Sequence, residues 1–424
     1  MPTHSSLKAN TEASFAQLGV AAEICDGLAT RGITHPFAIQ ELTLPLALDG
    51  RDLIGQARTG MGKTYAFGVP LIDRVFDDAA LPELNGQPHA LIITPTRELT
   101  VQVADDLTTA AQFTPVTVTA IYGGQPIDPQ IKKLHDGVDI VVGTPGRLLD
   151  LHSRGDLGLS EIGVLVLDEA DEMLDLGFRP QIEKLLRALT NPHQTMLFSA
   201  TMSGEVLSLA RTFTNKAVNI RAEQATEATT HDKITQIAFL CHRMDRDDIV
   251  AKLLQAHGRE HCIIFTRTKR SAATLAEVLR ERDFKVVAVH GDLNQSQREK
   301  ALNQFRNGNV DTLVATDVAA RGIDVDNVTH VINYQTPDDP KTYVHRIGRT
   351  GRAGRTGMAI TLVDHEDYNR WQAINEELGL GLADIPEWFS TSPELLEAVD
   401  IPEDAGTVNA PTPARRTRHR RAKR

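Results

Sequence analysis

Residues 57 to 64 read Ala57-Arg58-Thr59-Gly60-Met61-Gly62-Lys63-Thr64, between a short apolar run and a stretch with helical spacing. Small residues let backbone N–H groups converge on phosphate oxygens, while a lysine and a hydroxyl reach phosphate and Mg²⁺. The positive N-terminal end of the following helix adds to this attraction. Ala57 stands where the usual pattern has its first glycine. A glycine-rich helix cap is the alternative, but the segment favours a phosphate-binding loop.

An acidic segment, Asp168-Glu169-Ala170-Asp171, follows the apolar run Val164-Leu165-Val166-Leu167. Such a run is typical of a buried parallel strand, and α/β sheets bind ligands at the C-terminal ends of their strands. We expect Asp168 to hold Mg²⁺ through water and Glu169 to orient and deprotonate the attacking water. Acidic residues after a strand are often only a solvated helix start. The phosphate loop upstream favours the catalytic interpretation, so the two segments predict hydrolysis of a nucleoside triphosphate.

Taken in order along the chain, these segments and those below resemble the motifs of DEAD-box ATP-dependent RNA helicases of the bacterial RhlE-like type. The resemblance runs from about Phe15 to about Val363, which is most of the chain. It implies an α/β fold of two tandem RecA-like P-loop domains with parallel sheets. It also implies ATP and Mg²⁺ as cofactors, with nucleotide contacts along residues 57–64, Mg²⁺ at Thr64 and Asp168, and RNA as the partner.

The segment Gly32-Ile33-Thr34-His35-Pro36-Phe37-Ala38-Ile39-Gln40, with Phe15 upstream, is similar to the family's adenine-reading Q motif. Gln40 can offer its amide both ways to the adenine edge, and a wrong base would leave buried polar groups unpaired. We expect Phe15 to offer a stacking face, with a core aromatic residue as the alternative. The family pattern usually has phenylalanine at position 33 and Thr-Pro where this chain has Phe37-Ala38.

Three segments of the first half each follow a strand-like run and, in the family, grip the RNA backbone. Threonine, arginine and exposed backbone N–H groups contact phosphate without reading sequence. Taken singly, each segment is more often an ordinary turn. The resemblance assigns RNA contacts to Pro95, Thr96, Arg97, Gly123, Gly124, Thr144, Pro145 and Arg147. It assigns the coupling of hydrolysis to unwinding to Asp171, Ser199 and Thr201, although Ser199-Ala200-Thr201 carries almost no weight as a bare tripeptide.

The second half continues the resemblance, again with polar segments that follow apolar runs. RNA contacts are implied for Arg267, His290, Gly291, Asp292, Gln295, Arg298 and Thr316. Asp324 is expected to hold the ribose of the nucleotide. Roles in coupling are implied for Asp317, Arg321 and His345.

Arg346, Arg349 and Arg352 recur at helical i, i+3, i+6 spacing and are interleaved with glycine. Their usual family role is to reach across to the γ-phosphate, and an arginine finger of this kind contributes roughly 10³–10⁵ in rate. We expect Arg349 and Arg352 to be the fingers and Arg346 to make an inter-domain contact with residues 168–171. A structural salt bridge is the alternative for any one of the three.

The organisation of the chain also favours two domains. At 424 residues it exceeds one ordinary domain. Strand-like runs alternate with helical stretches in both halves, as in parallel α/β sheets. We predict an N-terminal helicase domain over residues 1–221, a linker over 222–232 and a C-terminal helicase domain over 233–379.

Residues 380–424 are predicted to form a disordered tail, acidic and proline-rich to residue 413 and basic over 414–424. Within it, Trp388-Phe389 is interpreted as a docking spot or as a small apolar anchor on the second domain. The basic end predicts extra RNA affinity or contact with RNA-degradation or ribosome-assembly proteins, with a merely solubilising tail as the alternative.

Composition narrows the class of protein further. The net charge of −11 argues against a protein that binds nucleic acid non-specifically over its whole surface, and favours a local RNA groove. No apolar stretch approaches the roughly 20 residues of a membrane span, and no signal peptide is evident. Three widely spaced cysteines fit neither a disulfide framework nor a zinc site. A cytoplasmic monomer is the simplest expectation.

The leading hypothesis is an RNA-dependent ATPase that separates short RNA duplexes locally, with selectivity for RNA through 2′-OH contacts. In the family's mechanism ATP and RNA close the two domains, and hydrolysis resets the cycle. A second hypothesis is an ATP-gated RNA clamp or scaffold in an RNA-decay or ribosome-assembly complex. A DNA helicase is disfavoured by the Q motif and by the acidic quartet at residues 168–171.

Overall fold

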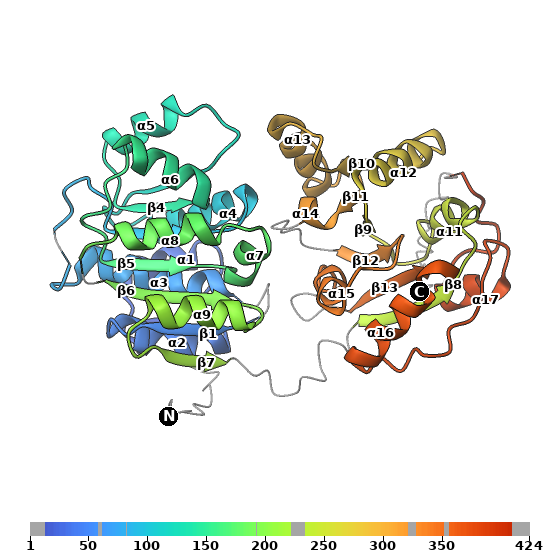
Figure 1. Cartoon of the computed structure of the whole chain (residues 1–424), viewed down its shortest axis with the longest axis horizontal. Coiled ribbons are helices and arrows are strands. Elements are labelled where there is room, and N and C mark those ends of the chain that lie inside the picture. The colour runs from blue at the N-terminus through green and yellow to red at the C-terminus, as the bar shows by residue number, and fades with distance from the viewer. Residues whose placement is uncertain are drawn as a thin grey trace, which may run out of the picture. The chain divides into compact units, whose positions relative to one another are not determined.

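The computed structural model describes residues 13–57, 62–81, 83–191, 193–221, 234–320, 328–351 and 356–408. The chain divides into two compact units between Glu227 and Ala228. This division falls inside the predicted linker 222–232, which lies outside the described residues. Each unit carries one parallel sheet with helices on its faces (Figure 1).

The first unit contains seven parallel strands in the order β3-β4-β2-β5-β6-β1-β7. The strands are β1 (Leu53–Gln56), β2 (Ala90–Ile93), β3 (Val118–Ile121), β4 (Ile140–Gly143), β5 (Val164–Leu167), β6 (Gln194–Ser199) and β7 (Val218–Arg221). Strands β2, β4, β5 and β6 are buried along their whole length. Burial on both faces explains why β2, β4 and β5 are continuous apolar runs rather than alternating ones.

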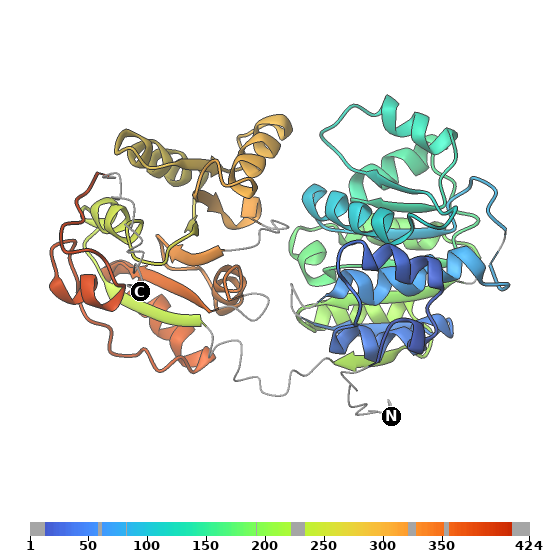
Figure 2. The same ribbon diagram turned by 180° about the vertical axis from the view of Figure 1, so that it is seen from behind.

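Successive residues of these strands face two separate cores, as strand geometry requires. Val164 and Val166 join the core under α1 (Ala22–Ala29), α2 (Ala38–Leu48), α3 (Lys63–Asp77) and α4 (Arg97–Ala110). Leu165 and Leu167 join the core under α6 (Pro145–Arg154), α7 (Ala170–Asp175), α8 (Arg179–Ala188) and α9 (Gly204–Phe213). Figure 1 shows α6, α8 and α9 in front of the sheet, and Figure 2 shows α1 to α4 over its other face. The short helices η1 (Ala16–Leu18) and α5 (Asp128–His135) complete this unit.

The second unit contains six parallel strands in the order β10-β11-β9-β12-β13-β8. These are β8 (Ile234–Leu240), β9 (His261–Thr266), β10 (Val286–Val289), β11 (Thr312–Thr316), β12 (Val328–Asn333) and β13 (Gly357–Val363). The helices are α11 (Arg246–Leu253), α12 (Lys269–Glu281), α13 (Gln295–Arg306), α14 (Asp317–Ala320), α15 (Pro340–Ile347), η2 (His365–Asp367), α16 (Tyr368–Leu378) and α17 (Pro393–Ala398). Helices α11 and α12 bury side chains in one core, and α15 and α16 bury theirs in another. Within the described ranges, no helix of either unit is both long and apolar enough to cross a membrane.

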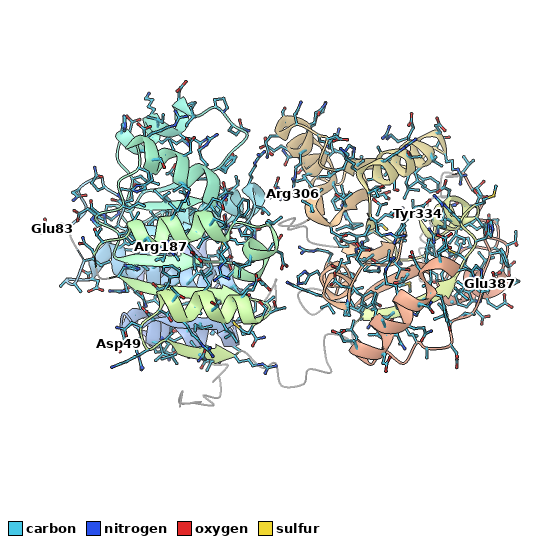
Figure 3. All side chains as sticks on the ribbon, in the orientation of Figure 1. Asp49, Glu83, Arg187, Arg306, Tyr334 and Glu387 are labelled. Carbon is cyan, nitrogen blue, oxygen red and sulfur yellow. The ribbon has the colours of Figure 1, made fainter. Side chains whose placement is uncertain are left out.

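The expected disorder from residue 380 is wrong for residues 381–408, which pack on the second unit; Figure 3 labels Glu387 of this segment. The Trp388 ring lies 5.0 Å from that of Phe239, so the apolar-anchor interpretation of Trp388 holds. Leu395 and Val399 are buried in the same core as β9 and α12. The segment has too few apolar residues for a core of its own, but it completes one that already exists. Residues 409–424, with the basic end of the chain, lie outside the described residues.

The three cysteines are free thiols in different surroundings. Cys241 and Cys262 are buried in the second unit, where burial raises the pKa of Cys262 to about 12. Cys25 lies on α1 of the first unit and is half-buried.

Candidate functional site

The phosphate loop predicted at residues 57–64 lies between β1 and α3. Ala57 extends the strand pairing, because its N–H donates to the Ser199 carbonyl at 3.2 Å. Gly62 adopts φ 77°, a left-handed conformation that glycine tolerates, and caps α3. Thr64 stands in the first turn of that helix and is half-buried. Four residues of the predicted loop, Arg58, Thr59, Gly60 and Met61, lie outside the described residues.

Lys63 is the strongest sign of a ligand in this loop. Its side chain is 6% exposed, and its Nζ has no hydrogen-bond acceptor among the described residues. A buried ammonium without an acceptor is costly, so the position favours a bound anion that supplies one. The Lys63 side chain starts at the N-terminus of α3, where backbone N–H groups and the helix dipole also favour a phosphate group.

The acidic residues follow β5, as predicted, and are buried. Asp168 is 2% exposed and Glu169 is 7% exposed. The Glu169 N–H donates to Asp168 Oδ1 at 2.9 Å. Burial raises the pKa of Asp168 to about 7, the Lys63 ammonium opposes this change, and the neighbouring Glu169 charge adds to it. A nearby cation stabilises the ionised form of such a buried carboxylate, which fits a site for metal-bound phosphate.

Glu169 has a left-handed backbone, with φ 52° and ψ 51° at the start of α7. Outside glycine this conformation costs of order 1–2 kcal/mol and is found at sites where the backbone must aim a side chain. Here the turn ends the strand abruptly and starts a helix within one residue. It therefore places two successive carboxylates at the C-terminal end of β5.

Asp171 joins the acidic segment to the end of β6. Its Oδ2 accepts from the Thr201 N–H at 2.9 Å and from the Thr201 hydroxyl at 2.7 Å. Its N–H donates to the Ser199 hydroxyl at 3.3 Å, and that hydroxyl donates to the Thr201 carbonyl at 2.8 Å. Burial alone would raise the pKa of Asp171, but hydrogen bonds from Thr201 and Ser199 and the Lys63 charge outweigh it and lower the pKa. The structure thus brings together the three residues of this unit that are predicted to act in coupling.

The adenine-reading segment lies beside the phosphate loop, but its side chains are arranged differently from the expectation. Gln40 is 1% exposed; its Oε1 accepts from the Phe37 N–H at 2.8 Å and its Nε2 donates to the Gly62 carbonyl at 2.9 Å. Phe15 is 2% exposed and packs in the core with Ile24 and Leu28. This burial favours the alternative of a core aromatic residue over the expected stacking role of Phe15.

The predicted RNA contacts of the first unit lie at the C-terminal ends of the adjacent strands β2, β3 and β4. Thr96 caps α4, and Pro95 is buried before it. The Arg97 guanidinium packs on Gly124, where any Cβ would lie 2.2 Å from Arg97 Nη1. Arg147 Nη2 donates to the Gln125 carbonyl at 3.2 Å, next to this glycine. The other residues of these segments, Gly123, Thr144 and Pro145, belong to the same strand ends.

The predicted RNA contacts of the second unit follow β9, β10 and β11, again neighbours in the sheet. Arg267 forms a bidentate ion pair with Asp367 at 2.9 and 3.2 Å. Asp292 pairs with Lys269 at 2.7 Å, and Arg298 donates to the Ala319 carbonyl at 2.9 Å. The remaining members of this set are His290, Gly291, Gln295 and Thr316.

Arg346 differs from its expected role. Its side chain is 1% exposed and donates to both Asp317 oxygens at 2.6 and 2.8 Å. It also donates to Asn333 Oδ1 at 3.2 Å and to the Gln335 carbonyl at 2.9 Å, and its guanidinium lies over the Phe265 ring. Within its own unit Arg346 is therefore described by the alternative of a structural salt bridge, while the expected contacts with residues 168–171 and with the nucleotide stay predictions. Asp317, expected to act in coupling, is its partner.

The other predicted residues of this region fall into two groups. Arg349 and His345 are half-buried in or just after α15. Arg321, Asp324 and Arg352 lie outside the described residues, so their predicted roles stay predictions. From the sequence we assigned no role to Phe37. The signal that could have drawn attention to it is the phenylalanine at a position where the family pattern usually has threonine.

The fold and this site define a P-loop nucleoside triphosphatase built from two RecA-like α/β units. Comparison with protein-family models matches residues 37–209 to the DEAD/DEAH box helicase family and residues 245–354 to the helicase conserved C-terminal domain. The chain belongs to the DEAD-box family of ATP-dependent RNA helicases.

Curated relatives and solved structures agree with this assignment. The chain is 43% identical over 364 residues to the ATP-dependent RNA helicase CshA of Listeria monocytogenes, covering 85% of this chain and 68% of the relative. It is 42% identical over 401 residues to DeaD of Klebsiella pneumoniae, covering 94% of this chain and 61% of the relative. The structure of S. cerevisiae Dbp5 bound to RNA and ADP BeF3 is similar, with a TM-score of 0.76, 34% identity, and coverage of 88% and 95% of the two chains.

Proposed function

We propose that this chain couples RNA-stimulated ATP hydrolysis to the local opening of short RNA duplexes or to the remodelling of RNA–protein complexes. The chain spans 61% to 68% of the length of the two curated relatives described above. The observation that carries the proposal is the buried Lys63 ammonium, which has no acceptor among the described residues and lies near the buried Asp168–Glu169 pair. That arrangement fits a bound triphosphate and a hydrolytic carboxylate.

The roles of these residues follow from their positions. Lys63 would hold the β- and γ-phosphates, and Thr64 with Asp168 would hold Mg²⁺. Mg²⁺, when bound, neutralises charge on the phosphate oxygens. Glu169 would orient the attacking water and accept its proton. The hydrogen bonds between Asp171 and Thr201 would link movement at the acidic segment to the end of β6.

RNA is proposed to bind through its backbone. In the first unit Arg97 and Arg147 meet at the loop of Gly124, at strand ends that neighbour the acidic segment. Guanidinium groups and backbone N–H groups of this kind bind phosphate and position a strand without reading its sequence. The S. cerevisiae Dbp5 structure contains RNA, which favours the same class of partner for this chain.

Stimulation by RNA is proposed to work through closure of the two units around ATP and RNA. Arg349 and Arg352 would then reach the γ-phosphate and complete the catalytic set, while hydrolysis would reopen the units. Whatever bridges both units favours the closed state, so ATP and RNA should each raise the affinity for the other.

Finer assignments rest on the sequence. We propose a monomer of the bacterial RhlE-like subgroup with a cytoplasmic location, supported by the motif resemblance and by the cysteine pattern. The basic residues 414–424 are proposed to tether RNA or to contact RNA-degradation or ribosome-assembly proteins. The second candidate, an ATP-gated RNA clamp, uses the same site and differs in yielding little unwinding per ATP consumed.

The test is steady-state ATPase activity without nucleic acid, with single-stranded RNA and with a matched DNA, for wild type and Glu169→Gln. We expect strong stimulation by RNA only, and its loss in Glu169→Gln with nucleotide and RNA binding retained. Equal stimulation by DNA, or none by either, would contradict the proposal. Turnover of Glu169→Gln close to wild type would contradict the role of Glu169.

A further inference from the structure

The Phe37 ring is unusually exposed for an aromatic residue held in a fixed position. It is 62% exposed, more than any other described phenylalanine. Its backbone caps α2, and its N–H donates to Gln40 Oε1 at 2.8 Å. The residue is therefore anchored by its main chain while most of its apolar ring faces water. Single exposed apolar residues are common, so this exposure by itself does not indicate a ligand.

The second observation is where the ring lies. A Cβ added to Gly62 would be 2.6 Å from Phe37 Cδ2 and 2.5 Å from Gln40 Nε2. The ring thus covers the backbone of the last glycine of the phosphate loop. The next residue is Lys63, whose buried Nζ has no acceptor among the described residues and so points independently to a ligand. One apolar ring face and one unsatisfied cation are therefore placed at the same end of α3.

The third observation is the lack of another suitable face in this segment. Phe15 is 2% exposed, and Ile33 packs against the same core as Phe15. Among the described hydrophobic residues of the adenine-reading segment, Phe37 alone is exposed. The Phe37 ring and the Gln40 amide both contact Gly62, so a base that extends from the phosphate loop toward Gln40 would meet this ring.

We propose that Phe37 is the surface on which the base of ATP stacks, in place of Phe15, and that it determines how much the base contributes to affinity. This inference rests on the proposed ATP binding. Stacking on an aromatic ring is tolerant of base identity, because every base has a π face. Selectivity between bases then belongs to the hydrogen-bonding groups around Gln40. Removing the ring should weaken adenine and guanine nucleotides alike.

The experiment measures equilibrium binding of ADP, GDP and tripolyphosphate to the full chain by calorimetry. The variants are Phe37→Ala and Phe37→Tyr, with Phe113→Ala as the matched control, since Phe113 is a 55% exposed phenylalanine of the same unit. We expect Phe37→Ala to weaken ADP binding roughly 5- to 100-fold and GDP binding by a similar factor. Tripolyphosphate affinity should not change, and Phe37→Tyr and Phe113→Ala should bind ADP like wild type.

Two results would overturn the inference. ADP affinity that is unchanged in Phe37→Ala would show that the base does not use this ring. Equal losses for ADP and tripolyphosphate would show that Phe37 acts only by packing on Gly62. A wild-type chain that bound neither ADP nor tripolyphosphate would instead overturn the proposed function itself.

Discussion

Replacing Arg346 by alanine is expected to destabilise the second unit by about 3 kcal/mol. The substitution removes four hydrogen bonds and leaves the Asp317 carboxylate without its counter-charge. Breaking one side of a buried ion pair costs about 3–5 kcal/mol. The lower end applies because the Asp317 side chain is 27% exposed, so water partly replaces the lost partner. Stability, rather than contact with the nucleotide, is the expected role of Arg346.

The chain carries a natural probe for this measurement. Its two tryptophans, Trp371 and Trp388, both belong to the second unit. Tryptophan fluorescence during urea unfolding therefore reports that unit alone. With a slope of roughly 2 kcal/mol per molar urea, the midpoint of Arg346→Ala should fall by about 1.5 M. Arg349→Ala is the matched comparison: its side chain is half-buried rather than buried, so its midpoint should fall by less than that of Arg346→Ala, while RNA-stimulated ATPase activity should fall by roughly 10³-fold or more.

The two variants together can refute the reasoning. A midpoint of Arg346→Ala within about 0.5 M of wild type would show that the buried network contributes little stability. If that same variant also lost ATPase activity, Arg346 would have a role beyond its own unit, as its spacing with Arg349 and Arg352 first indicated.

Three further predictions concern other parts of the chain. Lys63→Ala should abolish binding of ADP in calorimetry without shifting the tryptophan-detected midpoint, and unchanged ADP affinity would contradict the phosphate-loop assignment. Burial and the nearby Arg259 charge lower the pKa of His330 from 6.5 to about 4. Between these two pH values His330 is protonated in the unfolded chain but neutral in the folded unit. Its contribution to the free energy of unfolding should therefore be constant above pH 6.5 and fall by at most about 3 kcal/mol between pH 6.5 and 4. His330→Gln should lose less stability than wild type over this pH range. Equal pH profiles of the unfolding free energy for the two chains would contradict the prediction. Trp388→Ala should lower the midpoint reported by Trp371, at a cost of about 2–3 kcal/mol for a half-buried ring; an unchanged midpoint would show that residues 381–408 do not brace this unit.

The strands and the acidic segment could be predicted because local patterns decide them. The run from Val164 to Leu167 is apolar on both faces, as expected of a parallel strand that is covered on both sides. The position of Asp168 and Glu169 follows directly from where that strand ends.

Side-chain roles near these elements depended on packing that no local pattern records. Phe15 lies upstream of the adenine-reading segment and Phe37 lies within it, and only the packing around them decides that the first is buried and the second exposed. Helical spacing placed Arg346 on a common face with Arg349, but could not show that the Arg346 guanidinium forms an ion pair with Asp317. The segment around Leu395 has too few apolar residues for a core of its own, so its sequence indicated disorder. In the structure it packs into a core that other parts of the second unit form.

The positions of the cysteines and tryptophans allow the distance between the two units to be measured in the native sequence. Cys25, the half-buried thiol, belongs to the first unit, while Cys241 and Cys262 are shielded in the second, which also holds both indole rings. Burial raises the pKa of Cys25, so attachment of an acceptor dye there calls for mildly alkaline conditions. Energy transfer from the indoles to that dye would then follow the separation of the two units in solution. Opening and closing during a catalytic cycle could thus be timed in the native sequence, without any engineered cysteine.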